Sequence, residues 1–389
     1  MKPIFEDTIE SVYFDNAATT IIDGEVVNAM LPFLEERYGN PAASYHLGRD
    51  AEDAVNESRT KISDLLGSNP EDIVFTSGGT ESNNWALRCA GHTKNTISSS
   101  GDLPIAVCSA VEHNSVLECV KFSHNGVVIP VDEYGRISIP ALSEVLEHNK
   151  VRIVSVQHCN NELGSIQDIP EIADIVHAAG ALFHVDAVQS FGKWKWDVDD
   201  LGADLVSISA HKIHGPMGVG ALWIKPDTPI FPFMLGGGQE LERRSGTLAV
   251  PCIVGFGKAA EMSWTNIDNN SKLQKEMLNG LASDLNVRHG ITRNGINLAP
   301  HIASMNLPAE ASMIAAILNQ KFGICLSTGS ACETRSQKSH VLEAIGMSLA
   351  EQQRVLRVSI SRFTTARHIS MLRSSIDMAL REEDARKLF

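Results

Sequence analysis

Short apolar runs alternate with segments of helical periodicity along the first two thirds of the chain. The runs lie at residues 72–76, 105–109, 151–157, 181–186, 203–209 and 220–224. Amphipathic segments at 49–66 and 169–179 lie among them and end at Gly67 and Gly180, the residue type that commonly terminates a helix. Strands that alternate with helices predict an α/β fold with a mostly parallel sheet covered by helices on both faces.

The pattern changes after about residue 255. A long helical stretch at 252–285 leads into a weaker α+β region, with strands expected near 303–307 and 356–361. A chain of 389 residues is long for one core. We therefore predict a large domain over residues 14–255 and a smaller domain built from residues 1–13 and 256–389.

Polar side chains follow four of the predicted strands at the point where each strand ends. They are His113, Asn160 and Asn161, Asp186 and Gln189, and His211 and Lys212. Ligands of open α/β sheets bind at the carboxyl ends of the strands. These four clusters therefore predict one site at that edge.

Charge and cysteine content exclude several classes of function. The formal net charge of −14 argues against direct binding to the phosphates of a nucleic acid, although a product could still reach a nucleic-acid pathway through partner proteins. Seven cysteines without a CxxC pair predict neither a disulfide framework nor a metal site.

The N-terminus has no leader pattern and no apolar run is long enough to span a membrane, so we expect a cytoplasmic protein.

Two segments carry candidate binding chemistry. Gly78 and Gly79 lie between a strand and a helix that starts near Thr80, which predicts a phosphate cradle, with an ordinary tight turn as the alternative. Asp186 ends an apolar strand. An acid there suits the pyridine nitrogen of a cofactor such as pyridoxal phosphate, and the alternative is a helix N-cap.

Two further segments carry candidate reactive groups. Lys212 follows a buried strand and lies between two histidines, so it could form a Schiff base with an aldehyde cofactor, with a solvated surface lysine as the alternative. Cys332 lies in a small, polar, glycine-containing segment. It predicts an exposed nucleophile on a mobile loop, with an incidental surface thiol as the alternative.

Together these segments resemble the cysteine desulfurase family, in the class V aminotransferase group of fold-type I pyridoxal-phosphate (PLP) enzymes. The resemblance covers nearly the whole chain, in the order 13–20, 39–41, 76–83, 112–115, 160–164, 184–189, 209–218, 236–240, 244–248, 326–334, 357–359 and 363–365. It implies a large domain with a mostly parallel, seven-stranded sheet and a smaller α+β C-terminal domain that carries the cysteine loop.

The resemblance also implies a role for each matching residue. Lys212 would hold PLP covalently, Asp186 would pair with its pyridine nitrogen, His113 would stack on its ring and handle protons, and Gln189 would bind its phenolic oxygen. The phosphate would be held by Gly79, Thr80, Ser209 and His211, and by Thr247 of a neighbouring subunit, which implies a homodimer. Asn161, which also borders the cofactor, and Arg357 would bind the substrate carboxylate.

The implied reaction takes sulfur from L-cysteine, releases L-alanine and leaves a persulfide on Cys332. A sulfur-acceptor protein would then receive the sulfur for iron–sulfur cluster assembly, tRNA thiolation or sulfur modification of DNA. The sequence does not choose among these acceptors, and it leaves activity on selenocysteine open. Met217 and the pair Glu333-Thr334 differ from the residues usual at these positions of the family motifs, which leaves the subfamily open.

Two rival functions use the same scaffold. An aminotransferase or β-lyase would share Lys212, Asp186 and the phosphate cradle but would not need Cys332. A non-catalytic assembly scaffold would need none of them, so the intact set of Lys212, Asp186, His113 and Cys332 argues against it.

Overall fold

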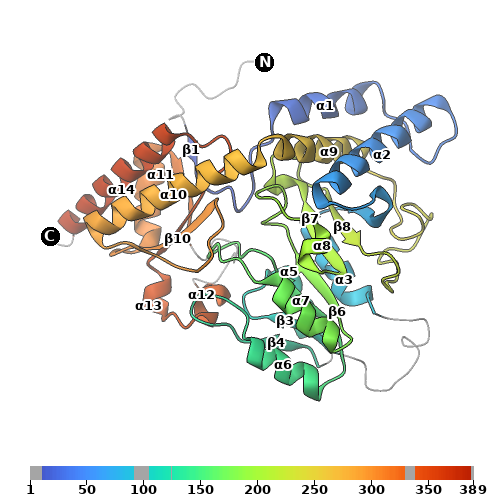
Figure 1. Cartoon of the computed structure of the whole chain (residues 1–389). Coiled ribbons are helices and arrows are strands. Elements are labelled where there is room, and N and C mark those ends of the chain that lie inside the picture. The colour runs from blue at the N-terminus through green and yellow to red at the C-terminus, as the bar shows by residue number, and fades with distance from the viewer. Residues whose placement is uncertain (1–10, 92–104, 124, 329–337, 387–389) are drawn as a thin grey trace.

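A seven-stranded sheet forms the centre of the larger of two lobes (Figure 1). The computed structural model describes residues 11–91, 105–123, 125–328 and 338–386. The strands follow the order β2 (Ile73–Thr76), β8 (Gly220–Ile224), β7 (Leu205–Ser209), β6 (Leu182–Asp186), β5 (Val151–Gln157), β3 (Ile105–Ser109) and β4 (Val127–Ile129). The strands from β7 to β4 are parallel, and β8 runs antiparallel to both of its neighbours. The predicted mostly parallel, seven-stranded sheet is thus confirmed.

The strands are apolar on both faces because helices cover both sides of the sheet. Every residue of β5 is buried, including Arg152. The Arg152 guanidinium donates to the carbonyl oxygens of Ala90 and Leu87, at the end of the neighbouring helix. These two bonds from Nη1 and Nη2 offset part of the cost of burying the cation.

The helices around the sheet have the bounds α1 (Gly24–Glu35), α2 (His46–Leu66), α3 (Gly79–Cys89), α5 (Asn114–Phe122), α6 (Ile139–His148), α7 (Ile169–Ala178), α8 (Val198–Leu201) and α9 (Val250–Thr265). Short 3-10 turns lie at Pro70–Asp72 and Ala210–Lys212. The predicted end of α2 at Gly67 is observed, and this glycine adopts a left-handed conformation with φ of 64°.

The predicted single helical stretch at 252–285 is wrong in one respect, because the structure has two helices there. α9 ends at Thr265 and α10 (Ile267–His289) begins after Asn266. Ile253 and Phe256 of α9 pack into the core of the large lobe, whereas Leu278 and Leu285 of α10 pack into that of the small lobe. We propose that the domain boundary lies at this break, rather than at residue 255.

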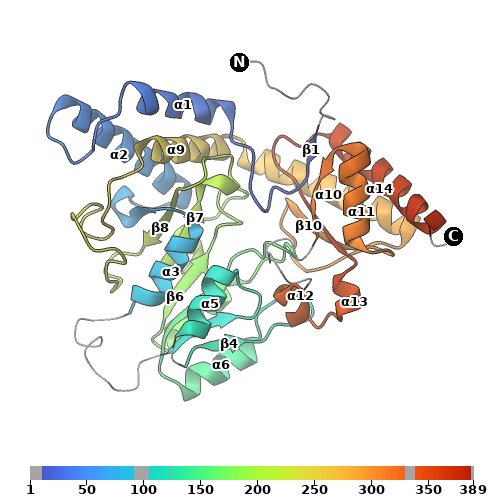
Figure 2. The ribbon, with the colours of Figure 1, turned by 180° about the vertical axis from the view of Figure 1, so that it is seen from behind.

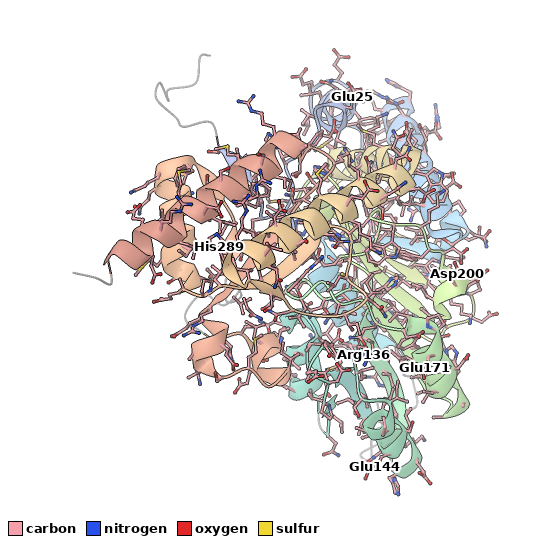
Figure 3. The ribbon with its side chains drawn as sticks, turned by 60° about the vertical axis from the view of Figure 1, so that its left-hand side comes forward. Glu25, Arg136, Glu144, Glu171, Asp200 and His289 are labelled. Carbon is pink, nitrogen blue, oxygen red and sulfur yellow. The ribbon has the colours of Figure 1, made fainter. Side chains whose placement is uncertain are left out.

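The small lobe contains the antiparallel sheet β12 (Ser327–Thr328), β13 (Val355–Ser359), β10 (Ile302–Asn306) and β9 (Thr292–Arg293). Its remaining helices are α11 (Ala311–Phe322), α12 (His340–Ala344), α13 (Leu349–Gln352) and α14 (Ala366–Arg386), seen from behind in Figure 2. α10 and α14 lie side by side (Figure 3), and Nε2 of the labelled His289 is 2.6 Å from Oδ1 of Asp377.

In the small lobe, the N-terminal segment packs against segments from the C-terminal part of the chain. The N-terminal strand β1 (Val12–Tyr13) pairs in parallel with β11 (Ile324–Cys325). The next residue, Phe14, is buried in the same core, and its carbonyl oxygen accepts from the amide of Ser359 at 2.7 Å. No helix in the described part of the chain is long and apolar enough to cross a membrane.

Candidate active site

The carboxyl ends of four adjacent parallel strands meet at one edge of the large sheet. These strands are β7, β6, β5 and β3, and they are the strands that the predicted polar clusters follow. Their parallel register brings residues that are distant in sequence to one place, on the side of the sheet that adjoins the small lobe (Figure 1).

Asp186 is the best-anchored of these residues. Its Oδ2 accepts a hydrogen bond of 2.7 Å from Nδ2 of Asn83 on α3, and its Oδ1 accepts one of 3.0 Å from the amide of Val188. The carboxylate is buried. A carboxylate that is fixed on both oxygens holds its direction, which is what pairing with a cationic ring nitrogen requires.

His113 is held by the same amide group. Nδ2 of Asn83 also donates to Oγ of Ser115 at 2.9 Å, and this hydroxyl lies 2.7 Å from Nδ1 of His113. The amide of Ser115 also donates to Nδ1, so the proton of the uncharged ring lies on Nε2. Burial lowers the pKa of His113, which leaves the ring uncharged at neutral pH.

The side chain of Glu112 lies beneath this histidine and is fully buried. Its Oε1 accepts from the hydroxyl of Ser109 at 2.5 Å and from the amide of Gln157 at 3.0 Å. Burial, with the nearby Asp186 carboxylate, raises the pKa of Glu112 to about 8. The carboxyl group is therefore largely protonated at neutral pH.

This shift predicts a specific pH dependence of stability. The folded-state pKa of Glu112 lies above the unfolded value, so the folded protein binds the extra proton between about pH 4.5 and 8. The stability that this group contributes is complete at low pH and falls as pH rises through that range, by on the order of 5 kcal/mol. We expect Glu112→Gln to abolish that fall, because an amide keeps the shape and cannot ionise.

The measurement is the free energy of unfolding in urea, at intervals from pH 5 to pH 8.5, for wild type and Glu112→Gln. The exposed Glu118→Gln on α5 is the matched control and should follow wild type. A constant difference between Glu112→Gln and wild type across the range would contradict a protonated Glu112.

Lys212 reaches back toward the N-terminal segment. Its Nζ donates to the carbonyl oxygens of Ala17 and Ala18, at 2.7 Å each. Nε2 of Gln189 donates to the same Ala17 oxygen at 2.8 Å. These carbonyl oxygens are uncharged acceptors, so a covalent partner of the candidate Schiff-base lysine can replace them.

The glycine turn before α3 provides an open helix N-terminus. Gly78 has φ of 150°, which favours glycine, and a Cβ at Gly79 would lie 2.6 Å from Cγ2 of Val188. No side chain caps this helix. The charge of Glu81, which could oppose an anion there, is balanced by an ion pair with Arg244 at 2.9 Å, and its Oε2 accepts from the amide of Ser77 at 2.8 Å. The first amides of α3 therefore favour an anion.

Two other predicted phosphate ligands, Ser209 and His211, lie just before Lys212 in the sequence. Ser209 ends β7, and its hydroxyl is buried without a hydrogen-bond partner in the described part of the chain. Nδ1 of His211 is 3.1 Å from the hydroxyl of Thr19. Burial, and then the charge of Lys212, lowers the pKa of His211 to about 4, so it acts as an uncharged group.

Arg357 and Asn161 lie together, as predicted for a carboxylate site, but Arg357 already has a partner. Nη1 of Arg357 donates to the carbonyl oxygen of Asn161 at 2.9 Å, and Nη2 pairs with Asp15 at 2.7 Å. Nε of Arg357 is buried and unpartnered in the part of the chain that the structure describes. A substrate carboxylate would have to share this guanidinium with Asp15.

Two predicted site residues are not brought to this cluster by the described single chain. Thr247 is exposed on the segment that precedes α9. Cys332 lies outside the described residues, but both ends of its segment are fixed. Ser327 pairs with Arg357 across β12 and β13, and after the gap Oγ of Ser339 donates to Oε2 of Glu162 at 2.6 Å.

The described residues fit PLP. Among the buried polar atoms that lack a partner in the described chain, Oγ of Ser209 and Oε1 of Gln189 belong to predicted cofactor ligands. The open N-terminus of α3, the fixed carboxylate of Asp186 and the amine of Lys212 supply the charges that the phosphate, the ring nitrogen and the aldehyde of PLP require.

Three residues of the site were missed by reasoning from the sequence. Asn83 joins Asp186 to His113 through Ser115, Glu112 supports the strand ends, and Asp15 pairs with Arg357. Asn83 and Asp15 lie in segments that carry the family resemblance. A polar residue inside an otherwise apolar helix face, as at Asn83, is the signal that could have identified it.

Comparison with known proteins agrees with this geometry. The class-V aminotransferase family profile matches residues 12–372. A cysteine desulfurase, IscS 1 of Archaeoglobus fulgidus, is 38% identical over 92% of this chain and 94% of its own length. The crystal structure of a NifS-like protein from Rickettsia africae is 30% identical, with a TM-score of 0.86 over 96% of this chain and 100% of that one. A structure described as SspA in complex with cysteine is 32% identical, with a TM-score of 0.78 over 91% of this chain and 99% of that one.

The fold is that of a class-V aminotransferase, a family of PLP-dependent α/β enzymes. Within this class the chain belongs to the cysteine desulfurase family, whose members remove sulfur from cysteine.

Proposed function

We propose that this enzyme binds PLP on Lys212 and transfers sulfur from L-cysteine to its own Cys332. One observation carries the proposal. The segment that contains Cys332 leaves the small lobe beside Arg357 and rejoins the described chain at Ser339, whose hydroxyl bonds to Glu162, the neighbour of Asn161. Both ends of the segment therefore border the candidate substrate site.

When bound, PLP supplies an electron sink that weakens first the Cα–H bond and then the Cβ–S bond of cysteine. The side chains around it have separate tasks. Asp186 keeps the ring nitrogen protonated, and the amides that begin α3 bind the phosphate with Thr80, Ser209 and His211. The amine of Lys212 holds the cofactor and, once displaced by substrate, can carry the Cα proton.

The substrate would be oriented through its carboxylate. Arg357 and Asn161 are adjacent, and the guanidinium is almost completely buried, which strengthens a charge-assisted bond. Asp15 fixes the plane of the guanidinium before the substrate arrives. This arrangement selects an α-amino acid, and Cys332 then selects one with sulfur at Cβ.

The transfer step balances without an outside oxidant. The thiolate of Cys332 attacks the sulfur of the substrate, a new S–S bond forms and the Cβ–S bond breaks. The electron pair of the broken bond stays on Cβ, which takes up a proton, and the carbon skeleton leaves as alanine. We assign to His113, which is uncharged at neutral pH, the task of taking the proton from the attacking thiol.

The active unit that we propose is a homodimer that hands its persulfide sulfur to an acceptor protein. Exposed Leu235 and Leu241, 86% and 73% accessible, lie on the segment that leads to Thr247. A second subunit would cover such apolar side chains and bring Thr247 to the partner's phosphate site. The acidic surface, with Glu25, Glu144, Glu171 and Asp200 facing outward, suits a protein acceptor (Figure 3).

The products formed from L-cysteine test this function. With a reductant such as dithiothreitol present, we expect the PLP-loaded enzyme to release alanine and sulfide in equal amounts, because each turnover leaves one persulfide to be reduced. Amino-acid analysis and a sulfide assay measure both. Release of pyruvate and ammonia with the sulfide would instead identify a β-lyase, and release of neither alanine nor sulfide would exclude desulfuration.

A further inference from the structure

A buried lysine lies behind the active site and has no partner there. Lys193 follows Gln189 on the turn after β6, and only 8% of its surface is exposed. No hydrogen bond or ion pair joins its ammonium to any residue that the structure describes. An unpaired cation of this kind is costly to bury, so its environment requires a physical explanation.

Lys193 lines a small cavity at the seam between the two lobes. Lys193 and Ile213, the residue after Lys212, come from the large lobe, Asn270 and Gln274 come from α10, and Arg362 follows β13 in the small lobe. The space open to the centre of a water-sized particle is about 20 Å³. That is enough for one water or one monatomic ion, since roughly 10–15 Å³ suffices for a water.

The wall of this cavity is positively charged. Its charged side chains are both cations, Lys193 and Arg362, and its remaining polar side chains, those of His214, Ser263, Asn270 and Gln274, carry no charge at neutral pH. Arg362 is already paired, through a 2.6 Å contact with Asp23, which leaves Lys193 as the cation without a described counter-ion.

The electrostatic surroundings of Lys193 agree with the geometry. Burial, and then the nearby cations Arg362 and Lys212, lowers the pKa of Lys193 to about 7. The thiol of Cys159 acts in the opposite direction, but its effect is smaller than those of burial and the two cations. Both ring nitrogens of the neighbouring His301 are also buried without a partner in the described chain, so this region lacks polar contacts.

We propose that this Lys193 cavity binds one small monovalent anion of the halide class, such as chloride, on the ammonium of Lys193. The anion supplies the missing counter-ion, and the amide groups of Asn270 and Gln274 are available to donate to it. Because the cavity is lined by both lobes and by α10, the bound anion links the three segments and stabilises their arrangement. This inference does not depend on the sulfur-transfer chemistry.

Bromide, which scatters X-rays anomalously, locates the site directly. Crystals of the PLP-loaded wild-type enzyme, grown without chloride and soaked in sodium bromide, should show an anomalous peak in contact with Nζ of Lys193. A cavity that holds only water in such crystals would overturn the proposal.

Solution stability separates specific binding from a general salt effect. We expect the thermal midpoint of the PLP-loaded wild type to be about 2 °C higher in 0.2 M sodium bromide than in 0.2 M sodium gluconate, whose anion is too large for the cavity. Lys193→Met, which keeps the length and removes the charge, should lose this difference. The matched control Lys195→Met, two residues away and exposed, should keep it.

An equal bromide effect in all three proteins would show a general salt effect only and would contradict a site at Lys193. If Lys193→Met does not fold, Lys193→Arg provides the second variant. Arginine keeps the positive charge but places it elsewhere in the cavity. The difference between the thermal midpoints of this variant in bromide and in gluconate should therefore be smaller than that of wild type. A difference equal to that of wild type would contradict the proposal.

Discussion

Cys332→Ala should lose release of both alanine and sulfide from L-cysteine, by at least about 10³-fold, while the enzyme keeps its bound PLP. The physical reason is that the substrate sulfur needs a nucleophile to accept it, and water does not replace a thiolate held beside the site. Initial rates of alanine and sulfide formation with a reductant present measure the loss, and the yellow absorption of the protein reports the cofactor.

The control is Cys325→Ala, which removes the nearest described cysteine before the loop. Cys325 is half-buried in β11, and its sulfur accepts only a weak contact from Asn319 at 3.6 Å. We expect this variant to keep the wild-type rate. A fully active Cys332→Ala would show that Cys332 does not carry the sulfur and would favour the β-lyase.

Lys212→Ala should lose activity by a similar factor, at least about 10³-fold, but for a different reason. The variant lacks the amine that holds PLP covalently and that can move the Cα proton. The carbonyl oxygens of Ala17 and Ala18, which accept from Nζ, cannot take over either task. The absorption of the covalently held cofactor should disappear together with alanine formation.

Lys212→Arg is the matched variant, since it keeps the positive charge and its hydrogen bonds to the two carbonyl groups. If the charge alone were needed, Lys212→Arg would retain activity and Lys212→Ala would not. We expect both to be inactive, with Lys212→Arg closer to wild type in thermal stability. An active Lys212→Arg would refute the covalent role of this lysine.

Much of the large lobe could be predicted from the sequence because its strands are continuous apolar runs that end in polar residues. β5 is buried along its whole length, and a run such as Val151–Gln157 has few other interpretations. The same regularity placed His113, Asp186 and Lys212 at one edge, since parallel strands bring their carboxyl ends together.

The remaining features depend on contacts that the local pattern does not encode. Asp15 and Arg357 pair across 342 positions in the chain, and each is an ordinary charged residue in its own segment. The break between α9 and α10 rests on Asn266 alone, within a stretch whose periodicity continues on both sides. The Lys193 cavity is formed by three segments, so only the folded chain reveals that this lysine lacks a partner.

The pairing of the N-terminal segment with the C-terminal part of the chain has a consequence during synthesis on the ribosome. The hydrogen bonds between Phe14 and Ser359 join residues 345 positions apart. At 5–20 residues per second, translation of that interval takes about 17–70 s. All strands of the large sheet emerge well before that, so the large lobe can fold first. Until its partner segments have been synthesised, β1 remains an unpaired strand. The nascent small lobe is therefore the part of this protein most in need of a chaperone.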